Sequence, residues 1–96
     1  MEDLSKEVAL ITGENDLEDF SEEKLERALT KYIFYLFEEK PSAVSQLLYR
    51  IDVSEEKAKA VFGAGTQDTT VAQDLAKLII ERLKLKIYYR NKYKDF

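Results

Sequence analysis

The chain has 96 residues, of which 45% are hydrophobic and 35% charged, with a formal net charge of -4 and neither cysteine nor histidine. This length suits one domain with one modest core, and the composition is that of a folding chain rather than a disordered one. Without cysteine there are no disulfide bonds or thiol nucleophiles, and without histidine the commonest neutral-pH general base and metal ligand are missing.

Three glycines and one proline are too few for the turns of an all-β sandwich, so we expect an all-α fold. The expected architecture is a compact bundle of about five helices forming a single domain over residues 1–96. The first helix is predicted over residues 4–12, because apolar residues recur there at helical spacing and Gly13 follows as a C-terminal cap. An acidic connection over residues 14–19 comes next, and its Leu17 is expected to reach the core.

A long helix, about residues 22–39, is predicted to start at Ser21, a favourable N-cap, and to end before Pro41. Its last turns hold six consecutive apolar or aromatic residues, which by themselves also suit a buried strand. Helical spacing decides for a helix, because the run continues a stripe on one face. The stripe consists of Leu25, Ala28, Leu29, Tyr32, Ile33, Tyr35 and Leu36.

Phe34 and Phe37 fall outside this stripe. Either neighbouring helices of the bundle cover both rings, or the rings belong to a second surface that anchors a partner chain or lines a ligand groove. The sequence leaves both interpretations open.

Two short helices follow, one capped by Ser42 and carrying apolar residues up to Ile51, the other capped by Ser54 and ending at Gly63 and Gly65. The last helix is predicted over about residues 70–93, with a capping box formed by Thr70 and Gln73.

The last helix carries two apolar stripes. One stripe contains Val71, Leu75, Leu78, Leu85 and Tyr89, and the other contains Ala76, Ile80, Leu83 and Ile87. In a chain this small, one stripe can face the core and the other a second copy, which predicts a homodimer. The equally open alternative is a single helix wrapped by its own short neighbours.

No constellation in the sequence indicates catalysis. The acidic residues 14–19 lack the spacing of a calcium loop and are expected to be solvated. Residues 63–66, Gly-Ala-Gly-Thr, precede a helix as phosphate-binding loops do, but no strand comes before them and no Lys-Ser or Lys-Thr pair follows. Helix capping explains both glycines.

Residues 42–62 resemble the helix, tight turn and second helix of a helix-turn-helix. Asp52 stands in the turn where glycine is common, and Glu55 and Glu56 begin the second helix. Two carboxylates at that end would face phosphates and base edges, which disfavours DNA binding.

The C-terminal end, about residues 88–96, is basic and aromatic, and we expect it to project from the bundle. Residues 1–40 hold twelve acids against five bases, so the chain itself offers a counter-surface. We expect this end to be solvated or paired with the chain, while an outside protein, nucleic acid or a membrane surface would suit the same pattern. The residues that could make such contacts are Tyr88, Arg90, Lys92, Tyr93 and Lys94.

We therefore expect a small non-catalytic helical protein, without cofactor or metal, that acts by self-association and protein-protein interaction. Its further predicted contact residues are Phe34, Phe37, Ile80, Leu83 and Ile87. The alternative is a nucleic-acid-binding regulator that uses residues 42–62 or the basic C-terminal end. A cytoplasmic location is expected, because no apolar run approaches the ~20 residues of a membrane span and the first residues lack the pattern of a signal peptide.

Overall fold

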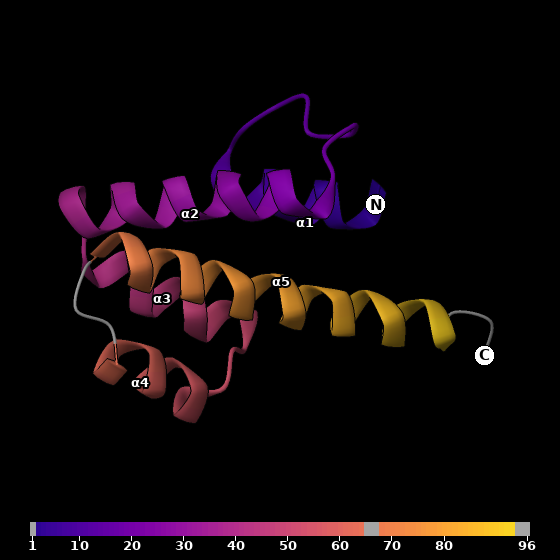
Figure 1. Ribbon diagram of the computed structural model, residues 1–96. Coiled ribbons are helices and arrows are strands. Elements are labelled where there is room, and N and C mark those ends of the chain that lie inside the picture. Colours follow the sequence, from indigo (N-terminus) through magenta and orange to yellow (C-terminus); the bar gives the residue numbers. More distant parts are fainter. Residues whose placement is uncertain (1, 65–67, 94–96) are drawn as a thin grey trace.

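A computed structural model describes residues 2–64 and 68–93 (Figure 1). The helices in these segments are α1 (Glu2–Thr12), α2 (Glu22–Glu39), α3 (Ser42–Ile51), α4 (Glu55–Ala64) and α5 (Asp68–Lys92). The described segments contain no strand, which confirms the all-α prediction, and α2 and α5 are the two long helices. Over the same segments, no helix combines the length and apolar character needed to cross a membrane.

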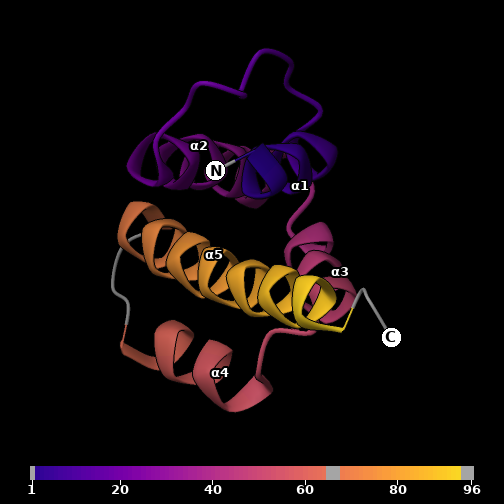
Figure 2. The ribbon, with the colours of Figure 1, turned by 90° about the vertical axis from the view of Figure 1, so that its right-hand side faces the viewer.

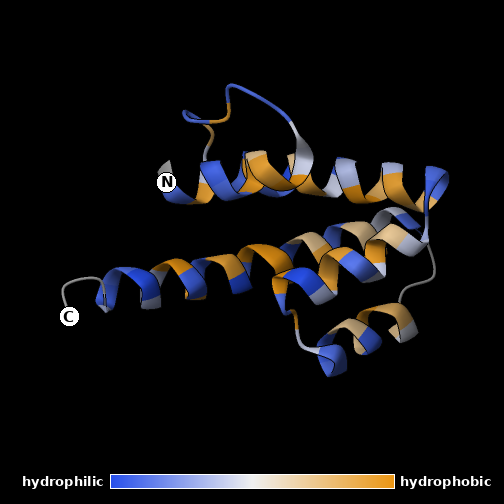
Figure 3. Ribbon diagram, turned by 180° about the vertical axis from the view of Figure 1, so that it is seen from behind, coloured by the Kyte–Doolittle hydropathy of each residue, from blue (hydrophilic) through white to orange (hydrophobic). Residues whose placement is uncertain are grey.

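The core is built on the packing of α2 against α5. In Figure 2, which looks along α5, helices α1 and α2 lie on one side of it, α4 lies on the opposite side and α3 flanks it. The side chains excluded from solvent at this centre include Leu25, Leu29 and Ile33 of α2 and Leu75 and Ile79 of α5. Apolar segments of the helices therefore meet inside the bundle, while the connection between α1 and α2 is largely hydrophilic (Figure 3).

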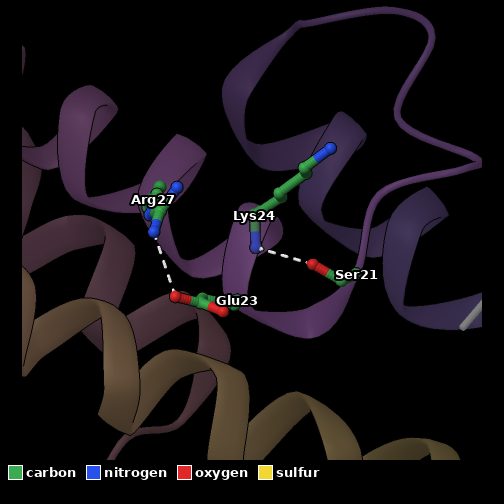
Figure 4. A network of polar contacts seen from close by, with 4 residues as sticks. All are labelled: Ser21, Glu23, Lys24 and Arg27. Carbon is green, nitrogen blue, oxygen red and sulfur yellow. Dashed lines mark hydrogen bonds and ion pairs between the residues drawn. The ribbon is translucent and has the colours of Figure 1, made fainter.

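Local sequence signals set most helix ends. The backbone N–H of Lys24 donates to Ser21 Oγ at 3.2 Å and so satisfies one free donor in the first turn of α2 (Figure 4). Arg27 and Glu23, one turn apart, form an ion pair at 3.0 Å on the same helix. At the end of α1, Gly13 takes a positive φ of 76° and donates its N–H to the carbonyl of Ala9.

Two predicted N-caps are wrong. Ser42 is the first residue of α3 rather than its cap, because the carbonyls of Lys40 and Pro41 already accept the first helical hydrogen bonds, so the helix starts directly after the proline. Thr70 is the third residue of α5, which begins at Asp68, so no capping box forms with Gln73. The predicted cap at Ser54 is confirmed, since its Oγ accepts the N–H of Lys57 at 3.4 Å.

The turn between α3 and α4 is a Schellman motif. Asp52 adopts the left-handed conformation, with φ 69° and ψ 43°, and its N–H bonds to the carbonyl of Tyr49 at 3.1 Å. The next N–H, of Val53, bonds back to the carbonyl of Leu48 at 3.0 Å, and both of these apolar side chains are buried. Asp52 thus occupies a position where glycine would be free of strain.

The apolar run in α2 is helical, as predicted, but its coverage differs from the expectation. The predicted buried stripe includes Tyr35, but this side chain is 57% exposed and stacks on Tyr32 with ring centroids 6.4 Å apart. Phe34 and Phe37 are partly buried and pack against the core. Phe37 also meets Phe62 of α4 edge to face at 6.4 Å, so side chains of the same chain cover much of both phenylalanines.

Candidate interaction surface

Solvent-exposed ion pairs connect α5 to the elements around it. Lys84 Nζ lies 2.9 Å from Glu22 Oε1 of α2, and Arg90 Nη2 lies 3.1 Å from Glu7 Oε1 of α1. On the other side, Arg82 pairs with Asp52 in the α3–α4 turn at 3.0 Å, and Glu81 pairs with Lys57 of α4 at 3.5 Å. Part of the basic C-terminal half of the chain is therefore paired with the chain's own acids.

The last turns of α5 extend past the ends of α3 and α4 (Figure 1). There Tyr88, Tyr89 and Tyr93 are about half exposed and contact one another. The rings of Tyr88 and Tyr89 meet edge to face at 5.2 Å, and those of Tyr89 and Tyr93 stack at 6.4 Å. Lys92 Nζ lies 5.9 Å from the Tyr88 ring centroid and 5.6 Å from that of Tyr93, within the range of cation–π interactions.

Two grooves run along the exposed side of α5. The first, of about 480 Å³, lies between α5 and the start of α2, with Ile80, Leu85 and Tyr88 as its apolar part and Glu22 and Glu26 on the α2 wall. The second, of about 230 Å³, lies between α5 and the α3–α4 turn. Glu81 and Leu85 line both grooves and so form a ridge between them.

We call this ridge and its continuation the α5 outer face, consisting of Glu81, Leu85, Tyr88 and Lys92. These residues follow at intervals of four, three and four, so at about 100° per residue they lie on one side of the helix. All four are exposed, with Leu85 at 43% and Tyr88 at 57%. Among the described helices, none other lies on the side of α5 away from α3 in Figure 2.

The structure places the predicted contact residues in three groups. Ile80 and Leu83 are 3% and 4% exposed and belong to the chain's own core, so the predicted free second stripe of α5 does not exist. Ile87 is partly buried against the core. The exposed members are Tyr88, Arg90, Lys92 and Tyr93, while Lys94 lies outside the described residues.

Sequence reasoning missed several exposed apolar side chains. Leu10 and Tyr49 are 79% and 85% exposed, and Leu85 and Phe62 are also exposed. Leu10 and Tyr49 lie off the apolar stripes of α1 and α3, and this offset is the signal that could have identified them. Leu85 gave no such signal, because its spacing fits the apolar stripe with Leu78.

The segment resembling a helix-turn-helix is an open pair of helices. Within the described residues, α3 and α4 both pack on α5 but not on each other. A groove of about 440 Å³ lies between them, and its lining includes the buried Leu48 and the exposed Tyr49 and Phe62. Glu55 and Glu56 are exposed at the start of α4, where they would repel a phosphate backbone.

In residues 2–64 and 68–93, no three carboxylate, histidine or cysteine side chains gather closely enough to hold a metal ion. Of the sequence Gly-Ala-Gly-Thr at 63–66, Gly63 and Ala64 are the last residues of α4, and the remaining two lie outside the described residues. Gly63 is thus within the helix and is not its cap.

Comparisons with known protein families, with curated proteins and with solved structures gave no match.

Proposed function

We propose that this chain is a non-catalytic helical protein that acts by self-association, and that the α5 outer face is the surface through which two copies meet. The observation that carries the proposal is the exposure of Leu85 and Tyr88, with Tyr89 and Tyr93 beside them, on a helix whose opposite side is buried as far as Leu83. An exposed group of large apolar side chains is typical of a protein-binding surface, and tyrosines are enriched among the residues that dominate binding energies.

The polar surroundings of the outer face suit a second copy of the chain. Glu26 of α2 and Glu81 of α5 stand beside the groove, where Glu22 is paired with Lys84, and Lys92 lies on the outer face in the last turn of α5. A second copy brings the same two signs of charge, so its Lys92 can meet these carboxylates. Complementary charges at the rim favour association and fix the orientation of the partners.

Sedimentation equilibrium of the unmodified chain and of Tyr88→Glu tests this proposal. We expect a dimer for the unmodified chain and a monomer for the variant, because a carboxylate would be desolvated at the centre of the contact. Tyr49→Glu is the matched control, since Tyr49 is 85% exposed on α3 and lies away from this face. An unmodified chain that stays monomeric at the highest attainable concentration would refute the proposal.

A second candidate function is nucleic-acid binding by the end of α5. The stacked rings of Tyr89 and Tyr93 with Lys92 beside them are the kind of platform on which single-stranded bases stack. Binding of single-stranded RNA and DNA across a salt series tests this candidate, with Arg90→Glu combined with Lys92→Glu as the variant. Phosphate contacts predict binding that weakens steeply with salt. No binding by the unmodified chain at low salt would remove this candidate.

A further inference from the structure

We propose that two copies pair through the α5 outer face as antiparallel helices, related by a two-fold axis that passes between Leu85 and Tyr88. This inference rests on the self-association proposed above and assigns its geometry. In this arrangement Leu85 of each copy contacts Tyr88 of the other, and Lys92 of each copy faces Glu81 of the other.

Ridge-and-groove packing supports a helix as the occupant. Glu81 and Leu85 form a ridge with a groove on each side, and one groove is bounded by α2 and the other by the α3–α4 turn. Helices pack by placing the ridge of one into the groove of the other, with axes about 8–10 Å apart. The α5 helix of a second copy presents the same ridge and the same grooves. The same patch on each copy can therefore form the two sides of a two-fold symmetric contact.

Charge decides the direction of the second helix. A parallel pair would bring Lys92 against Lys92 and Glu81 against Glu81, and each of these pairs of like charges repels. An antiparallel pair instead brings Lys92 beside Glu81, whose 3.5 Å pair with Lys57 is exposed to solvent, and towards Glu26 of α2. Like charges placed together at an interface oppose binding, so the antiparallel direction is favoured.

The register follows from the apolar residues. Centring the pair between Leu85 and Tyr88 overlaps only the last turns of the two α5 helices, from about Glu81 to Lys92. The last of these turns extend past α3 and α4 (Figure 1), and an overlap limited to the helix ends directs the remainder of each bundle away from the other. The rise per residue then places Glu81 of one copy opposite Lys92 of the other. Glu81 of one copy lies about 16 Å along the helix axis from Glu81 of the other, and the same holds for the two Lys92 residues.

Engineered cysteines test this pairing directly, because the chain has no cysteine of its own. The variants are Glu81→Cys and Lys92→Cys, each alone and mixed, under mild oxidation. The control is Tyr49→Cys, whose side chain is exposed on another helix. Facing residues of paired helices come within the Cα separation of about 4.4–6.8 Å that a disulfide bond needs, and residues about 16 Å apart do not.

We expect a covalent dimer when Glu81→Cys and Lys92→Cys are mixed and oxidised. We expect no covalent dimer when either variant, or the control, is oxidised alone. If each variant crosslinks with itself as well as in the mixture, the helices are parallel and the proposed pairing is overturned while self-association stands. If the mixed cysteine variants give no crosslink although the unmodified chain is dimeric by mass, the contact lies elsewhere and the pairing is also overturned. A monomeric unmodified chain removes both this inference and the proposed function.

Discussion

Replacing Ile80 by alanine should test whether this position belongs to the fold or to an interface. Its side chain is 3% exposed, so the change removes three buried carbons. At ~0.8 kcal/mol per buried methylene group the transfer loss is about 2.4 kcal/mol. The cavity left behind adds to this, and we expect Ile80→Ala to destabilise the fold by about 3 kcal/mol, within the range measured for such core truncations.

Leu85 is the matched comparison on the same helix, because it is 43% exposed. Leu85→Ala removes side-chain surface that is only about half buried and leaves no closed cavity, so the expected loss is about 1 kcal/mol. Urea unfolding at protein concentrations low enough to keep the chain monomeric measures both changes, with an expected total stability of about 5–14 kcal/mol. Equal losses for the two variants, or a loss below about 1 kcal/mol for Ile80→Ala, would contradict the packing of α2 on α5 described above.

Three further outcomes are expected from the local structure, each measured by urea unfolding. Ser21→Ala should lower the free energy of unfolding by about 1 kcal/mol, because α2 loses its N-cap. The control Ser45→Ala changes an exposed serine within α3 and should cause no loss, so equal effects would argue against the cap. Asp52→Val should cost about 1–3 kcal/mol, because a branched side chain is strained at φ 69° and the exposed pair with Arg82 is also lost. An unchanged stability would show that the turn relaxes. Arg90→Gln should change stability by less than about 1 kcal/mol, since its pair with Glu7 is exposed to solvent, and a larger loss would show that this pair matters more than its exposure implies.

The sequence predicted the five helices and the long apolar face of α2 because both depend on local spacing and caps. It misassigned Tyr35 because the period of a helix gives the direction of a buried face but not its width. Tyr35 sits at the edge of that face, next to Ala28. The width depends on the diameters and positions of the neighbouring helices, which are tertiary properties.

The same limit explains why the prediction of a free second stripe on α5 was wrong. Its two apolar stripes are adjacent parts of one broad buried arc, because α1, α2, α3 and α4 all pack around this helix. Ile80 and Leu83, expected at an interface, therefore lie in the core. Tyr89 shows the converse, since it continues the buried side of α5 but is 50% exposed. It belongs to the last turns of the helix, which extend past α3 and α4 (Figure 1). Spacing along a sequence contains no information about where a neighbouring helix stops.

The order of the helices along the chain also affects how the protein folds. α2 is complete at Glu39, but its main packing partner, α5, starts at Asp68. During synthesis, α1 and α3 can cover only part of the apolar face of α2. The remainder, which includes Leu29 and Ile33, stays exposed until α5 leaves the ribosome. Contacts this far apart in sequence slow folding, and exposed apolar faces invite aggregation or chaperone binding. The central pairing that stabilises the finished bundle is thus among the last contacts to form.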